Sequence, residues 1–123
     1  MKTEVAPERQ ILGIPFAGNV HAMWVFDRET LVFLDVNDAA VQTYGYSREE
    51  FLRMRIVDIR PPEDVPELLR ETKSPRPKGP STGDGWRHWN KSRKIFPVAV
   101  TSWELTFRGR PAELVLARGD SRL

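Results

Sequence analysis

Residues 36–50, with the sequence VNDAAVQTYGYSREE, constrain the fold more than any other part of the chain. Either Asn37 or Asp38 can cap a helix, because the oxygen of a short side chain accepts a hydrogen bond from a backbone N–H group of the first turn. Gly45 can end that helix in the left-handed conformation. Ser47 and Glu50 have the spacing of a capping box. The segment therefore predicts two short, consecutive helices.

Runs rich in apolar and β-branched residues lie on both sides of these helices. Residues 22–26 and 31–36 predict two strands joined by a turn. Pro61 and the acids after it favour a helix start, and that helix has one apolar face, made of Val65, Leu68, Leu69 and Thr72. Three more strands are predicted, at residues 86–91, 95–107 and 112–117. This order indicates an α+β domain with one five-stranded antiparallel sheet.

The same segments resemble the PAS family of sensor domains. Residues 37–50 are similar to the family signature N-x-a-a-x-x-x-x-G-Y-s-x-e-E, and residues 58–64, DIRPPED, are similar to its D-I-x-P-x-E-D connection. The resemblance implies a PAS-like sheet with short helices packed on one face. It also implies three parts: an N-terminal segment at 1–19 with a short cap helix, a PAS sensor domain at 20–120, and the start of a linker to a missing effector at 121–123.

Two departures from the family pattern affect the strand connections. The family usually has Lys-Asp-Gly in one hairpin, where residues 91–93 are Lys-Ser-Arg. Losing the glycine predicts a longer or distorted turn, because glycine best tolerates positive φ. The family also ends its last strand with D-I-T, and the resemblance implies that Asp120 and Ser121 take that role here, with a shifted register and an imperfect match.

The resemblance implies a ligand site between the concave face of the sheet and the helices. Its inward-facing residues are expected to be Tyr44, Ile59, Leu68, Leu69, Trp86, His88, Val98, Val100 and Val115. Two interpretations stay open: these residues either fill a core at native packing density, or they line a pocket for a small molecule. Likewise, His88 either contacts a ligand or senses pH, or it is a core residue with a satisfied hydrogen bond.

No cofactor, metal or catalytic residue is expected. The chain has no cysteine, which excludes a cysteine-linked chromophore and a covalent flavin adduct. Haem binding is disfavoured, because Leu68 stands where haem-binding members have a histidine. His21 and His88 lack the converging carboxylates of a metal site. The carboxylate pairs Asp35/Asp38 and Glu49/Glu50 are expected to cap helices and face solvent.

The outer face of the sheet also carries large apolar residues. Trp89, Trp103 and Leu105 are predicted to point away from the ligand site, and something should cover them. One candidate is the N-terminal segment, with its apolar residues Ile11, Leu12, Ile14 and Phe16. The other is a second subunit, so a homodimer through the outer sheet face and the N-terminal segment is expected.

Composition limits the remaining alternatives. A chain of 123 residues is the size of one domain, and its net charge of +2 does not favour nucleic acid. It has no apolar run of about 20 residues that could cross a bilayer, and no signal peptide, so a cytoplasmic location is expected. The sequence therefore predicts a sensory or regulatory PAS domain of a signal-transduction protein, such as a histidine kinase, that binds a small ligand or a partner. The alternative is a structural dimerisation module with a filled core.

Overall fold

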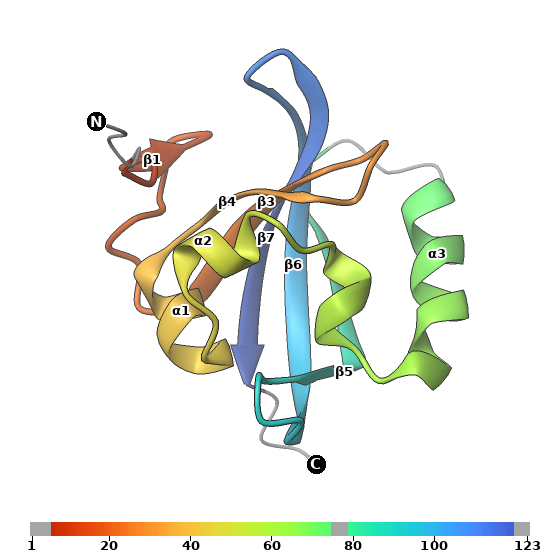
Figure 1. Cartoon of the computed structure of the whole chain (residues 1–123). Coiled ribbons are helices and arrows are strands. Elements are labelled where there is room, and N and C mark those ends of the chain that lie inside the picture. The colour runs from red at the N-terminus through yellow and green to blue at the C-terminus, as the bar shows by residue number, and fades with distance from the viewer. Residues whose placement is uncertain (1–5, 75–78, 120–123) are drawn as a thin grey trace.

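Five strands form one antiparallel sheet, which dominates the computed structural model of the chain (Figure 1). The structure describes residues 6–74 and 79–119. Across the sheet the order is β4-β3-β7-β6-β5. The strands are β3 (Ala22–Asp27), β4 (Phe33–Val36), β5 (Ser81–Trp89), β6 (Ile95–Phe107) and β7 (Arg110–Gly119). The first two strands and the last three thus meet in the middle, where β3 pairs with β7. The α+β fold expected from the sequence is confirmed.

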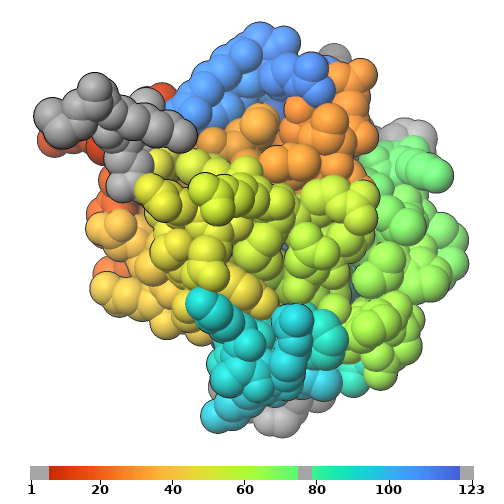
Figure 2. All heavy atoms as spheres, viewed as in Figure 1, coloured from red at the N-terminus to blue at the C-terminus, as the bar shows by residue number. Residues whose placement is uncertain are grey.

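Short helices cover one face of this sheet, as Figure 2 shows for the segment between β4 and β5. They are α1 (Asp38–Tyr44), α2 (Arg48–Phe51), the 3-10 turns η1 (Ile56–Ile59) and η2 (Pro62–Asp64), and α3 (Val65–Lys73). Their buried side chains pack in one cluster with the inner face of the sheet, and Trp24, Tyr44 and Phe51 are the largest of these. Burial of these aromatic rings supplies much of the stabilisation of the fold.

The helical signature of residues 36–50 forms the local structure that its sequence predicts. Asn37 caps α1, and its Oδ1 accepts hydrogen bonds from the backbone N–H groups of Ala40 and Met23, each at 3.0 Å. Gly45 ends α1 with φ of 82°, in the left-handed region that glycine tolerates. The Ser47–Glu50 capping box starts α2 with both of its reciprocal hydrogen bonds.

The N-terminal segment corrects one expectation, because its described residues, 6–19, form a hairpin and no cap helix. Strands β1 (Gln10–Ile11) and β2 (Ile14–Pro15) are joined by a two-residue turn, and both turn residues, Leu12 and Gly13, have positive φ. This turn type suits a tight hairpin and cannot continue a helix. Beyond the hairpin, Phe16 is fully buried.

This segment covers part of the outer face of the sheet. The second apolar cluster joins Ile11 and Phe16 to residues of the sheet such as Met23, Val25 and Leu114. Intrachain cover is therefore present. Trp103, Leu105 and Leu116 lie at the edge of the cluster and stay half-buried.

Several strand boundaries differ from the expected ones, and β7 in particular is longer at both ends, at Arg110–Gly119. β4 begins only at Phe33, because Leu31 takes φ of 67° at the end of the β3–β4 turn. β5 begins earlier, at Ser81, and a register shift between Gly83 and Trp86 accommodates its two glycines as a bulge. The turn after β5 spans residues 90–94, with Arg93 at φ of 69°. The long, distorted turn expected from the missing glycine is thus confirmed.

Trp89 corrects the expectation that it points to the outer face. Its indole Nε1 donates to the backbone carbonyl of Asp58 on η1 at 3.0 Å, so the ring reaches around the edge of the sheet to the helical side. A strand at the edge of a sheet has no neighbour to prevent this. The expected linker at 121–123 and the Asp120–Ser121 pair lie outside the described residues. Within the described part of the chain, no helix is both long and apolar enough to cross a membrane.

Candidate ligand cavity

A cavity of about 90 Å³ lies between α3 and the inner face of the sheet. Leu68 of α3 forms one wall, and Trp24, Phe26, Trp86, Val100 and Val115 of the sheet contribute apolar side chains. Polar residues also line it, namely Arg60, Glu71, Thr72, Ser81, Thr82, Ser102 and Glu113. Glu71 and Thr82 are exposed, so the mouth of the cavity lies between α3 and the start of β5. The volume is large enough for a few water molecules or one small molecule.

Arg60 is the buried cation of this cavity. It follows η1, and only 7% of its surface is exposed. Its guanidinium lies over the ring of Trp86, with Cζ 5.4 Å from the ring centroid. Among residues 6–74 and 79–119 its guanidinium has no hydrogen-bond acceptor and no ion-pair partner, and its Nε is fully buried. Burial lowers the pKa of Arg60 to about 10, so the side chain keeps its charge at neutral pH.

Two acids line the cavity, the exposed Glu71 of α3 and Glu113 of β7, and of these Glu113 is buried. It stands directly across from Glu104 of β6, and two like charges in such a cross-strand pair repel each other. Arg28 relieves this repulsion, because it forms ion pairs with both carboxylates. Arg28 also donates to the backbone carbonyl of Thr72 at 3.2 Å. Glu113 is therefore part of a charge cluster that reaches the end of α3.

Polar contacts hold α3 at both ends, while its apolar contact with the core is small. At its start, Arg87 of β5 binds Asp64 through two hydrogen bonds of 2.8 and 2.9 Å, and this contact lowers the pKa of Asp64. At its end, the Arg28 contact holds Thr72. Leu68 is the one residue of α3 that is buried. Such a helix can move against the sheet more easily than one with a wide apolar face.

Tyr44 and His88 form a buried polar pair next to the cavity. The Tyr44 hydroxyl lies 2.6 Å from Nδ1 of His88, and both side chains are inaccessible to solvent. Desolvation lowers the pKa of His88 well below its usual value, and the positive charge of Arg60 adds to this shift. Desolvation also raises the pKa of Tyr44. Both groups are therefore neutral, and His88 is a hydrogen-bonded core residue.

The nine residues predicted to face the ligand site divide into three groups. Leu68, Trp86, Val100 and Val115 line the cavity. Tyr44, Ile59, His88 and Val98 are buried in the closed core and do not line it. Leu69 is half-buried on α3 and does not line the cavity either. A ligand role for any of these residues stays a prediction.

Sequence reasoning missed the polar residues of the cavity, above all Arg60 and Glu113. Arg60 occupies the variable position of the DIRPPED connection, so the family pattern does not identify it. Glu113 offered a signal, because it lies on the same face of β7 as Val115 by period-2 alternation. An acid at an inward-facing position of an apolar strand is unusual.

Comparison with known proteins agrees with the fold. The family model for the PAS domain matches residues 16–77, which is half of the chain, so this chain belongs to the PAS family. No curated protein matches its sequence.

Among solved structures, a PAS domain from a two-component sensor histidine kinase is 27% identical, with a TM-score of 0.67 over 85% of this chain and 88% of that one. The PAS domain of an HTR-like protein from Haloarcula marismortui has a TM-score of 0.74 at 15% identity, covering 85% of both chains. The PAS-B domain of Drosophila melanogaster Cycle, solved with bound ethylene glycol, has a TM-score of 0.68 at 14% identity, covering 80% of this chain and 99% of that one.

Proposed function

We propose that this chain is the sensory domain of a signal-transduction protein, and that a small molecule in the cavity between α3 and the sheet is its signal. The observation that carries this proposal is a cavity of about 90 Å³ lined by both apolar and buried polar side chains. Ligand sites combine these two kinds of lining, since apolar walls give affinity and a few polar groups fix orientation. The likeness to a PAS domain of a sensor histidine kinase supports a role in signalling.

The signal would act through α3. An occupant of the cavity contacts Leu68 on one side and β6 and β7 on the other, so it favours the position of α3 that fits it best. A ligand shifts such an equilibrium only by its difference in affinity for the two positions. The ion pairs of Arg28 and Arg87 would then carry the shift to the strands. An effector domain in a longer protein, such as a histidine kinase, would receive it, and any catalytic activity would belong to that domain.

Native mass spectrometry of the protein purified from cells tests whether a small molecule occupies the cavity. A bound molecule should add its mass to the intact chain and raise the melting temperature, because a ligand that binds only the folded state stabilises it. Replacing Val100 by Phe fills the cavity from the sheet side and should remove the adduct. The matched control is Ala99→Phe, which adds the same side chain at a half-buried position that points the other way on β6. An adduct that survives Val100→Phe contradicts a site in this cavity.

A second function, a structural module that forms a homodimer, is favoured by the outer sheet face. Trp103, Leu105 and Leu116 stay half-buried there after the N-terminal hairpin has packed. Sedimentation analysis distinguishes the two functions. A constitutive dimer that Trp103→Glu dissociates, together with a protein that carries no small molecule, favours the structural module. The expected cytoplasmic location and the lack of a cofactor stay predictions.

A further inference from the structure

The guanidinium of Arg60 identifies the class of molecule that the cavity accepts. A guanidinium has five N–H donors in a planar fork. In the described part of the chain none of these donors has an acceptor, although only 7% of the residue is exposed and Nε is fully buried. Stacking on Trp86 offsets part of the charge, but an aromatic face does not satisfy N–H groups that point in the plane of the guanidinium.

The neighbouring carboxylates do not fill this role. Asp64 is bound by Arg87 through both of its oxygens. Glu113 belongs to the charge cluster of Arg28 and Glu104. The charge of Asp64 still attracts Arg60 from a distance, but a buried cation without a hydrogen-bonded counter-ion is unfavourable, because the interior does not replace its lost hydration. An anion that enters the cavity would supply the missing partner.

We propose that the cavity binds a small organic carboxylate, whose two oxygens accept hydrogen bonds from Arg60 and whose carbon chain lies between Leu68 and Trp86. The inference rests on the proposed function and names the ligand class of the same site. A carboxylate matches the fork of a guanidinium with two parallel hydrogen bonds. A volume of about 90 Å³ limits the ligand to a few heavy atoms.

The lining of the cavity favours a single negative charge. Apolar and polar side chains contribute about equally to its walls, and two of the polar ones are the acids Glu71 and Glu113. A doubly charged phosphate would place an excess charge in this environment, with more acceptor oxygens than Arg60 can serve. A monocarboxylate neutralises the charge of Arg60, and its apolar carbon chain can pack against the apolar part of the walls.

Thermal unfolding with defined probes tests this inference. Propionate and pyruvate are the carboxylates, propionamide is the neutral isostere, and phosphate is the competing anion, all at one ionic strength set with sodium chloride. The carboxylates should raise the melting temperature in a dose-dependent way, while propionamide and phosphate should not. In Arg60→Gln the affinity for the carboxylates should fall at least tenfold. Arg53→Gln, at an exposed arginine on the same side of the domain, should bind them like the wild type.

Each other outcome has a definite meaning. If propionamide stabilises the protein as well as propionate does, or if Arg60→Gln keeps its affinity, the carboxylate inference is wrong while the small-ligand function stands. If phosphate alone stabilises it, the site binds inorganic anions and the inference is equally wrong. If no probe binds and native mass spectrometry finds no companion molecule, both proposals are wrong. Should Arg60→Gln fail to fold, Val100→Phe takes its place, and it must abolish the response to propionate.

Discussion

The phenolic oxygen of Tyr44 lies 2.6 Å from Nδ1 of His88, and this contact joins the end of α1 to the edge strand β5. Trp24 packs against both rings, with centroids 5.7 and 5.8 Å away. Nε2 of His88 is buried and has no hydrogen-bond partner among the described residues. The pair therefore connects the helical layer to the sheet with neutral groups, and protonation of His88 would place an unbalanced charge in the core.

The first prediction is a loss of stability in mild acid that depends on His88. Burial holds the pKa of His88 well below 6.5 in the folded state, while the unfolded chain keeps a pKa of about 6.5. Below pH 6.5 the unfolded state therefore binds a proton that the folded state does not. The free energy of unfolding should be fully retained above that pH and should fall by up to about 1.4 kcal/mol per pH unit below it.

Urea unfolding from pH 8 to pH 5 measures this effect. His88→Leu should remove this histidine's part of the pH dependence, although its absolute stability will differ. His21→Leu changes the exposed histidine before β3 and should keep the dependence. If wild type and His88→Leu lose stability equally between pH 6.5 and pH 5, His88 does not have the lowered pKa.

The sequence predicts the parts of this fold whose signals are local. Asn37, Gly45 and the Ser47–Glu50 box each act on backbone groups within four residues, so their effect can be inferred without a partner from elsewhere in the chain. The N-terminal hairpin is different. Its turn at Leu12 contains a residue that has no preference for positive φ, and the hairpin forms where its apolar side chains meet the outer face of the sheet.

The cavity is also hard to predict, because it depends on contacts between segments that are far apart in the sequence. Alternation along the strands identifies Trp86, Val100 and Val115 as inward-facing, but it cannot say which inward residues are packed and which border empty space. His88 alternates like Trp86 and lies in the closed core. Arg60 reaches the cavity from an irregular segment, where no period assigns a direction to a side chain.

The second prediction concerns Asn37, whose side-chain amide forms hydrogen bonds through both its oxygen and its nitrogen. Its Oδ1 accepts from Met23 and Ala40, and its Nδ2 donates to the backbone carbonyls of Phe16 and His21, at 2.9 and 3.0 Å. Asn37→Ala should lower the free energy of unfolding by about 2–4 kcal/mol. This is the cost of losing the helix cap plus the cost of leaving buried backbone groups without a hydrogen-bond partner.

Asn37→Asp is the matched variant, because it keeps the acceptor and replaces the donor by an oxygen, although it also places a carboxyl group in a buried site. It should therefore retain the N-terminal cap of α1 while it loses the link to the N-terminal segment. Chemical denaturation gives the two free energies, and hydrogen exchange at Ala40 reports on the cap. Equal stability of Asn37→Ala and wild type would contradict this role.

The third prediction is a stabilising substitution in the N-terminal turn. Leu12 has φ of 53° and is 54% exposed, and Gly13 follows it at φ of 74°. Asn accepts this conformation better than Leu does, and Asn-Gly is the favoured pair for a tight hairpin turn. Leu12→Asn should therefore raise the free energy of unfolding by about 0.5–1 kcal/mol. Val20→Asn, at another exposed apolar residue near the N-terminus, controls for the general effect of removing surface hydrophobicity, and an equal gain in both variants would contradict the conformational explanation.

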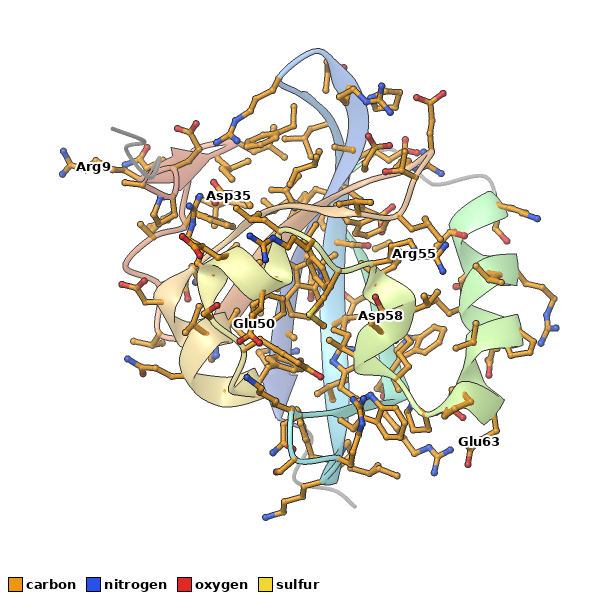
Figure 3. All side chains as sticks on the ribbon, in the orientation of Figure 1. Arg9, Asp35, Glu50, Arg55, Asp58 and Glu63 are labelled. Atoms are coloured by element: carbon orange, nitrogen blue, oxygen red, sulfur yellow. The ribbon has the colours of Figure 1, made fainter. Side chains whose placement is uncertain are left out.

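The fourth prediction corrects the expectation that Asp35 faces solvent. Asp35 is fully buried beside the N-terminal hairpin, with α2 close to it (Figure 3). Its carboxylate accepts from Arg48 of α2 at 2.8 Å and from the backbone N–H of Glu8 at 3.1 Å. One buried charge thus connects β4, α2 and the N-terminal segment.

Asp35→Asn should lower the free energy of unfolding by about 3–5 kcal/mol, the usual loss when one member of a buried ion pair is removed and the other stays. The N-terminal segment should also loosen, so the amide of Glu8 should exchange with solvent faster. Asp38→Asn changes an exposed acid in the first turn of α1, where the loss should stay below about 1 kcal/mol. Denaturation measures the first effect and amide exchange the second. Unchanged exchange at Glu8 in Asp35→Asn would show that the apolar contacts of Ile11 and Phe16 hold the segment without this charge.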